Sequence, residues 1–367
     1  MKTTHPRVSA WQVGLLVFIL SLCLTPFDLP SLLIPRMGPR SAWWGELPAL
    51  AVGLWGIAVV TALSRRALGR TLDRTVLAAM GPVAGYAYLA ALTGLFLFSV
   101  PGCLLVFAPA AHDDLLPRLP IAFVAVMVAA VGAYAARSGP ETIARCAEAL
   151  APLLVGGLLG IYVPLVGTHL GFGRLLPLRL PTWSQWLSPQ VVGATGTIRG
   201  FLPLLVLGPL MAGKPSAIRF GLASTLAWLL IVLAVIIPVV VFSGPLVREF
   251  SFPFLATETT VGWHWLPLRS LVVLTLLIWC VVTFLVFSTY LWMAAWLLRR
   301  LIPALPRRGP VEVLGACGAV VGSVPTFHTM FITWNIGVVL LGVFVPTGIL
   351  LFGRRSMPTR VSSRGSA

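Results

Sequence analysis

Ten charge-poor apolar runs, most of them long enough to cross a lipid bilayer, constrain this chain more than any other feature. They cover residues 9–34, 43–63, 78–108, 120–136, 145–167, 189–212, 219–243, 268–298, 311–326 and 331–352. The chain of 367 residues is 58% hydrophobic and 10% charged, and its mean hydropathy is +0.97. These values exclude an ordinary soluble domain. Because lipid offers no partners to backbone polar groups, we predict an all-α polytopic membrane protein with ten transmembrane helices.

Lysine and arginine residues separate between alternate loops. Of the 26, 18 fall at the two ends and in the loops of one side, and 7 fall in the loops of the other side. The positive-inside rule then predicts that both termini are cytoplasmic, as an even number of spans requires. Residues 1–353 are predicted to form one membrane domain, and residues 354–367 a basic cytoplasmic tail. The net charge of +16 is thus attributed to topology and anionic lipid, and nucleic acid is not an expected partner.

The first run contains two prolines and a charge. Pro26 and Pro30 each remove a helical N–H, and Asp28 lies between them. An acid at membrane depth is costly unless it faces a partner, water or a ligand. The first span is therefore predicted to be a discontinuous helix with a carboxylate at its break.

The sixth run is the counterpart of the first if the ten spans divide into two sets of five, about residues 9–167 and 189–352. A second copy of a five-helix unit is inverted, because five is odd. In the sixth run Arg199 is a lone charge among glycines and Pro203. Two interrupted helices at corresponding positions, one with an acid and one with a base, predict a ligand site near the bilayer midplane.

The start of the fifth run has a distinct pattern of charges. Ser138 and Glu141 are spaced as a capping box, with Pro140 predicted in the first helical turn. Glu141, Arg145 and Glu148 share one helix face. That face is either a docking or gating surface on the cytoplasmic side, or a charge-patterned helix end among lipid headgroups.

These residues carry a resemblance to a known family. The pattern Gly139, Glu141, Arg145, Glu148 and Pro152 is similar to one ahead of the fifth span of spore germination permeases, the GerAB-type subunits of germinant receptors in the amino acid–polyamine–organocation superfamily. Weaker matches are Gln12, Ser41-Ala42-Trp43, Leu175-Leu176-Pro177, Pro209 and Trp279. The chain departs from the family at the presumed ligand site. The first-span break has no glycine, and no acidic residue follows Gly200-Phe201.

The resemblance implies a LeuT-like inverted repeat of five plus five helices, with the first and sixth helices broken. It also implies the sensing of a small germinant, commonly an amino acid, in the spore inner membrane or cell membrane. The implied partners are a larger membrane subunit with a soluble domain and a lipoprotein.

The candidate ligand-binding residues lie at the two breaks and on the eighth span. Asp28 and Arg199 either hold a zwitterionic amino acid between them or form a structural ion pair that fastens the two helices. The other candidates are Thr25, Phe27, Gly196, Thr197, Gly200 and Phe201 from the breaks, and Thr283 and Phe287 from the eighth span. The alternative for each threonine is a hydrogen bond to its own helix backbone.

Two functions remain open from the sequence. One is a receptor subunit that binds a germinant and changes conformation, and the alternative is an amino acid permease coupled to protons through Asp28. An enzyme is not expected, because the chain lacks H-E-x-x-H and G-x-S-x-G motifs. Neither a metal nor another cofactor is expected, because the histidines and the five cysteines lack ligand spacing.

Overall fold

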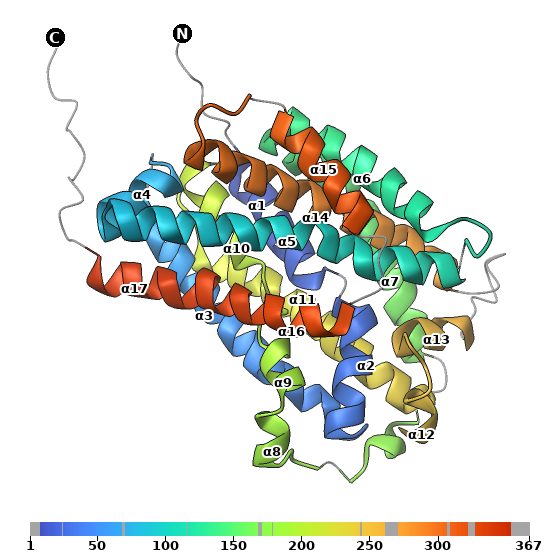
Figure 1. Cartoon of the computed structure of the whole chain (residues 1–367). Helices are drawn as coiled ribbons and strands as arrows, with labels where there is room; N and C mark the ends of the chain where they lie inside the picture. Colours follow the sequence, from blue (N-terminus) through green and yellow to red (C-terminus); the bar gives the residue numbers. More distant parts are fainter. Residues whose placement is uncertain are drawn as a thin grey trace, which may run out of the picture.

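The computed structural model describes residues 8–23, 25–67, 70–114, 116–167, 171–177, 179–242, 244–260, 271–306, 309–321 and 327–353. These residues are almost entirely helical (Figure 1). The tail predicted for residues 354–367 lies outside the described residues, as do residues 268–270 and 322–326 of two predicted spans.

The first half of the chain contains α1 (Ala10–Leu22), α2 (Thr25–Met37), η1 (Ala42–Glu46), α3 (Leu47–Arg66), α4 (Leu72–Met80), α5 (Pro82–Asp114), α6 (Ile121–Ser138) and α7 (Pro140–Gly167). The second half contains η2 (Phe172–Leu175), α8 (Trp183–Trp186), α9 (Pro189–Ala194), α10 (Phe201–Leu207), η3 (Gly208–Leu210), α11 (Ala217–Val241), α12 (Gly244–Val247), α13 (Pro253–Thr260), α14 (Val272–Leu301), α15 (Gly309–Val321), α16 (Phe327–Val339), η4 (Leu340–Phe344) and α17 (Val345–Phe352). The elements η1 to η3 are 3₁₀ turns, and η4 is a π-helical turn.

Eight helical segments of the described residues are long and apolar enough to cross a membrane. They are Ala10–Met37, Ala42–Arg66, Pro82–Asp113, Ile121–Ser138, Pro140–Val166, Ala217–Val241, Val272–Leu301 and Ile332–Phe352. Two shorter apolar helices, Phe201–Leu210 and Gly309–Val320, fall where the sixth and ninth spans were predicted. The protein is therefore a multi-pass membrane protein, whereas the count of ten spans stays a prediction.

Helix α14 is buried over its middle part. Every side chain from Leu285 to Ala295 is buried, and α14 lies against α5, α6 and α7 (Figure 1). A helix that is apolar all round needs such neighbours on every side. The neighbouring helices therefore enclose this middle part of α14.

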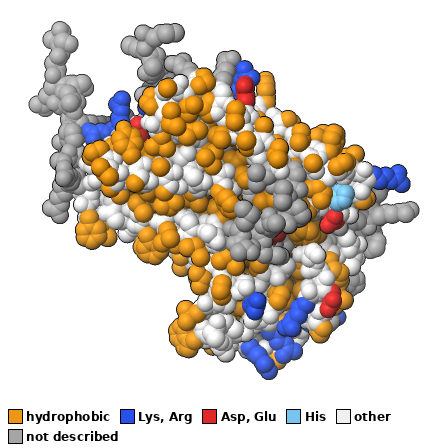
Figure 2. All heavy atoms as spheres, viewed as in Figure 1, with side chains coloured by type: hydrophobic (Ala, Val, Ile, Leu, Met, Phe, Trp, Pro, Cys, Tyr) orange, Lys and Arg blue, Asp and Glu red, His pale blue; other side chains and the backbone are white. Residues whose placement is uncertain are grey.

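The outer surface is apolar where lipid would contact it. Large hydrophobic side chains are exposed along α6, α7 and α11, for example Met127, Leu159 and Leu222. On the face shown in Figure 2, hydrophobic side chains cover the middle of the molecule, and charged side chains gather towards its edges. A soluble protein rarely exposes an apolar surface of this extent.

A short parallel sheet ties the start of the first span to the end of the sixth. Strand β1 (Val8–Ser9) pairs with β2 (Met211–Ala212), with Val8 opposite Met211 and Ser9 opposite Ala212. Directly after β1, Ser9 and Gln12 form a capping box at the start of α1. The beginning of α1 is thereby fixed to the segment that follows α10 and η3.

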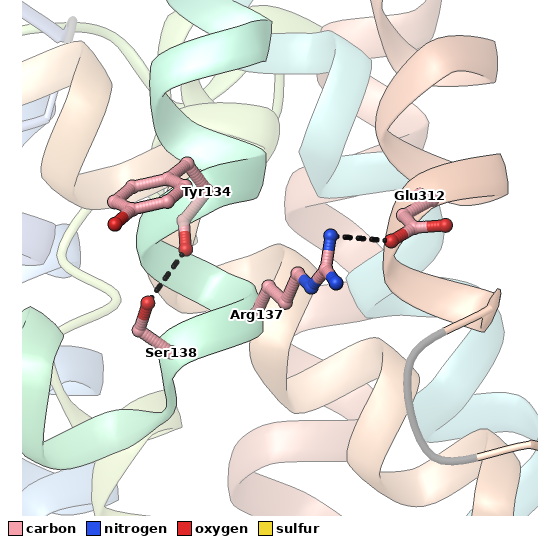
Figure 3. A network of polar contacts seen from close by, with 4 residues as sticks. All are labelled: Tyr134, Arg137, Ser138 and Glu312. Atoms are coloured by element: carbon pink, nitrogen blue, oxygen red, sulfur yellow. Dashed lines mark hydrogen bonds and ion pairs between the residues drawn. The ribbon is translucent and has the colours of Figure 1, made fainter.

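The capping box predicted at Ser138 is wrong. Ser138 is the last residue of α6, and its hydroxyl donates to the carbonyl oxygen of Tyr134 at 3.0 Å (Figure 3). The chain turns at Gly139, whose φ of +102° suits glycine, and α7 starts at Pro140. Ser138 is still part of α6, so its side chain bonds to the backbone of α6 and does not cap α7.

Candidate functional site

The first span is interrupted between α1 and α2. Helix α1 ends at Leu22, Cys23 has a φ of +34°, and α2 starts at Thr25. The interruption thus precedes both Pro26 and Pro30, although it was predicted between them. Pro26 lies in the first turn of α2, where its missing N–H costs little, and the helix continues through Pro30.

This start of α2 places Asp28 in its first helical turn, with only 5% of the residue exposed. The amino-terminal end of a helix favours a negative charge, because its N–H groups point outward. The neighbouring Phe27 is fully buried, and its ring lies 5.2 Å from that of Trp279 on α14. Asp28 is therefore next in sequence to a residue that joins the first span to α14.

The sixth span is interrupted between α9 and α10, over residues 195–200. A Cβ atom on Gly196 would lie 2.3 Å from the backbone oxygen of Asn335 on α16. A Cβ atom on Gly200 would lie 2.2 Å from Oγ of Ser21 on α1. Only glycine permits these approaches, so the interrupted segment is fitted between α1 and α16.

Arg199 lies in that segment and is only 2% exposed. Its guanidinium carbon lies 3.9 Å from the ring centre of Trp334, which is held by a 2.9 Å hydrogen bond from Nε1 to Ser99 Oγ. Within the described part of the chain, Arg199 Nε and Nη1 have no hydrogen-bond partner. A buried guanidinium with unused donors is suited to bind an anionic group.

Asp28 and Arg199 do not form a direct ion pair. No nitrogen–oxygen distance between these two described side chains is within 4.0 Å. Arg199 is nevertheless the charge that acts electrostatically on Asp28. The two buried charges thus interact through space without a direct contact.

Further unsatisfied polar groups are linked to one or the other member of this pair. In the described residues, Thr25 Oγ1, Trp279 Nε1, Tyr290 Oη and the Asn335 amide have no hydrogen-bond partner. Thr25 is one turn before Asp28, and Tyr290 lies within electrostatic range of Arg199. Asn335 follows Trp334 in sequence. Since buried polar groups are normally hydrogen-bonded, a concentration of unsatisfied groups here favours a ligand site.

Four of the predicted ligand residues have other contacts. The side chain of Phe201 fits against Gly56 and Gly342, and that of Phe287 fits against Gly132 and Gly318. The hydroxyl of Thr283 donates to Trp279 O at 2.7 Å, and that of Thr197 donates to Ala194 O at 2.7 Å. Each threonine therefore bonds to its own backbone. A ligand role for these four residues stays a prediction.

Sequence reasoning missed Tyr290, Trp334, Asn335 and the buried acid Glu46. Glu46 was detectable, because it is a lone acid near the start of the second apolar run. The other three are single polar or aromatic residues in apolar helices, and nothing in their local pattern distinguishes them. Their relevance comes from tertiary proximity: Trp334 stacks on Arg199, Asn335 lies against Gly196, and Tyr290 is within electrostatic range of Arg199.

The charged face of α7 lies away from Asp28 and Arg199. Glu148 Oε2 accepts a 2.8 Å hydrogen bond from Gln12 Nε2, which joins α7 to the start of α1. Arg145 is exposed, and Glu141 is half-buried. At the end of the neighbouring α6, Arg137 forms a 2.8 Å ion pair with Glu312 of α15 (Figure 3). These charges belong to a helix-end surface.

Comparisons with known proteins give one family and one fold. A family model described as "Spore germination protein" matches residues 7–337.

The structure is similar to that of MhsT in complex with L-phenylalanine, with a TM-score of 0.65, 14% identity, and coverage of 94% of this chain and 89% of that chain. It is also similar to MHP1, a nucleobase-cation-symport-1 family transporter in a closed conformation with bromovinylhydantoin bound. For MHP1 the TM-score is 0.63, the identity is 15%, and the coverage is 91% of this chain and 75% of that chain. The likeness confirms the expected LeuT-like fold, and no curated protein matches the sequence.

Proposed function

The chain belongs to the family of spore germination proteins, and on this premise we propose that it is the germinant receptor subunit that binds a small germinant. An amino acid fits the site best. The observation that carries this proposal is a buried acid at the start of α2 and a buried, incompletely bonded arginine in the interruption of the sixth span, which do not pair directly. The family and the fold are those of membrane receptors and transporters rather than of enzymes.

The chemistry of the two ends supports a zwitterion. The Asp28 carboxylate accepts hydrogen bonds from an ammonium group, and Arg199 Nε and Nη1 donate to a carboxylate. Tyr290 Oη and Trp279 Nε1 provide two further donors within the same region. A ligand with both charges neutralises both residues, which lowers the cost of keeping them buried.

The test is a binding panel of amino acids, simple amines and simple carboxylates on the purified full-length protein. Asp28→Asn is expected to weaken ligands that carry an amine at least tenfold, and Arg199→Gln to weaken ligands that carry a carboxylate by a similar factor, because each removes about 1.4 kcal/mol or more. Glu312→Gln removes a charge far from the interruptions and is the matched control. Equal losses for all ligands, recovered in the double variant, would instead indicate a helix clamp.

A second candidate function is a secondary transporter of an amino acid. The observation that favours it is the fold, because one of the similar solved structures is described as a transporter. Uptake by sealed proteoliposomes separates the two functions. A receptor subunit gives saturable binding without accumulation of the solute, and a transporter accumulates it against a gradient.

The proposed partners are the larger membrane subunit and the lipoprotein of the receptor, in the spore inner membrane. The exposed charges on α7, with Arg145 at their centre, are the proposed docking face. Arg145→Glu is expected to reduce co-purification of the partner subunits several-fold while ligand affinity stays within a few-fold. Loss of ligand affinity with normal assembly would place this face in the binding pathway instead.

A further inference from the structure

Glu46 is a second buried acid, separate from the pair at Asp28 and Arg199. It is the last residue of η1, at the start of the second span, and it is 0% exposed. Neither carboxylate oxygen has a hydrogen-bond partner of ordinary geometry among the described residues. Trp228 Nε1 donates to the backbone oxygen of Glu46 at 2.9 Å, which fixes the main chain and leaves the carboxyl unsatisfied.

The carboxyl of Glu46 lies beside the interruption of the sixth span. The Thr197 hydroxyl is a polar neighbour of this carboxyl. That hydroxyl already donates its only proton to Ala194 O at 2.7 Å. A hydroxyl has one proton and two lone pairs, so towards Glu46 it can only accept. Thr197 therefore has no proton left to donate to an ionised Glu46, which agrees with the absence of a hydrogen-bond partner for either carboxylate oxygen among the described residues.

No cation among the described residues neutralises Glu46. The elements packed against η1 are α2, α3, α9 and α11. Their charged residues are Asp28 and Arg36 on α2, Arg65 and Arg66 on α3, and Arg219 on α11, while α9 has none. None of them forms an ion pair with Glu46 within 4.0 Å.

The arginines on these elements are exposed or donate to backbone oxygens. Arg36 is exposed, Arg65 donates to Pro215 O, and Arg66 donates to Leu350 O. Arg199, in the interruption itself, stacks on Trp334 and acts on Asp28. An ionised carboxylate buried without a counter-charge is far more costly than a neutral carboxyl.

We propose that Glu46 is a proton-binding site: its carboxyl carries a proton in this conformation and releases it when residues 195–200 move and admit water. The proton passes between the carboxyl oxygen and water, and no other bond changes. Because Glu46 touches the interrupted segment, any ligand that shifts this segment also changes the affinity for the proton, and the reverse holds by linkage. The proton-binding site is formed by Glu46 and does not depend on which ligand binds at Asp28.

The experiment measures the unfolding of the purified full-length protein as a function of pH, for the wild type, Glu46→Gln and Glu46→Ala. The native state holds a proton on Glu46 that the unfolded chain releases at neutral pH. Stability should therefore fall as pH rises, by up to roughly tenfold in the unfolding equilibrium per pH unit. Glutamine imitates the neutral carboxyl, so Glu46→Gln should remain folded. It should also lose the part of the fall in stability with rising pH that comes from Glu46. Glu46→Ala should be less stable than Glu46→Gln at every pH, and Glu249→Gln, at an exposed position, should behave as the wild type.

Three results would overturn the proposal. If Glu46→Gln fails to fold, or is as unstable as Glu46→Ala, the ionised form is the one that the fold needs. If Glu46→Gln keeps the full pH dependence of the wild type, the titration belongs to another group. If sodium or potassium stabilises the wild type at constant pH and this effect is lost in Glu46→Gln, Glu46 is part of a metal-cation site. The ligand panel for Asp28 and Arg199 is unaffected by these outcomes, so the two proposals fail separately.

Discussion

The guanidinium carbon of Arg199 lies 3.9 Å from the ring centre of Trp334, so an aromatic face holds this buried cation where an acid is usually found. A cation over an aromatic ring is attracted by the negative face of its π system, and the attraction increases when water is excluded. The contact leaves Nε and Nη1 of Arg199 without partners among the described residues. Arg199 is therefore oriented without being neutralised, which keeps it available for an anionic ligand.

Replacement of Trp334 tests this role. Trp334→Leu should lower the free energy of unfolding by about 2 kcal/mol or more, because it removes a desolvated cation–π contact and the bond to Ser99. Trp334→Phe keeps a ring and should lose less. Thermal denaturation in detergent measures the difference, with the exposed Trp183→Leu as control. Equal losses for leucine and phenylalanine would show that the stack contributes nothing.

The interruption of the sixth span should not tolerate a side chain at Gly196. Gly196→Ala places a methyl group 2.3 Å from the backbone oxygen of Asn335, so backbone must move. We expect a loss of about 1–3 kcal/mol in stability, as for other overpacked sites. Gly156→Ala is the control, because nothing lies within 4 Å of its Cβ position. If the two variants are equally stable, the close approach of the interrupted segment to α16 is absent in the protein.

The hydrogen bond between Gln12 and Glu148 should couple α1 to α7. In a double-mutant cycle with Gln12→Ala and Glu148→Ala, we expect a coupling energy of about 0.5–1 kcal/mol, since the pair is partly exposed. Hydrogen exchange of residues 8–13 should accelerate in both single variants. Strictly additive effects would mean that the bond does not fasten the start of α1.

Reporter fusions test the orientation in the membrane. A reporter that is active only outside the membrane should work after Asp113 and should be silent after Gly353, because the positive-inside rule places the arginine-rich end in the cytoplasm. The opposite pattern would invert the topology, although it would leave the fold unchanged.

The helical spans were predictable because their signal is local. The fourth span was predicted at residues 120–136, and α6 covers Ile121–Ser138. The first interruption was misplaced by a few residues, because a proline breaks a helix interior but is tolerated in a first turn, and sequence does not state which position Pro26 holds. The capping box failed for a similar reason. Ser138 has the spacing of a capping residue, but the chain turns at Gly139, so Ser138 remains in the preceding helix.

The candidate site was only half predictable. Lone charges in apolar runs identified Asp28 and Arg199, because burial of a charge always needs an explanation. Helical spacing also put Thr283 and Phe287 on one face of the eighth span, yet it could not say which helices that face meets. Phe287 fits against glycines of α6 and α15. Trp334 is 135 residues from Arg199 in sequence, and a pairing over that distance follows from tertiary contacts.

The pairing of β1 with β2 gives the amino-terminal end a mechanical role. Val8 and Ser9 pair along the backbone with Met211 and Ala212. The first segment leads into the first interrupted span, and the second follows the other interrupted span. A force on the chain ahead of Val8 is therefore transmitted to α1 and to α10 at once. A molecule bound at this end would therefore act on the first and the sixth span together.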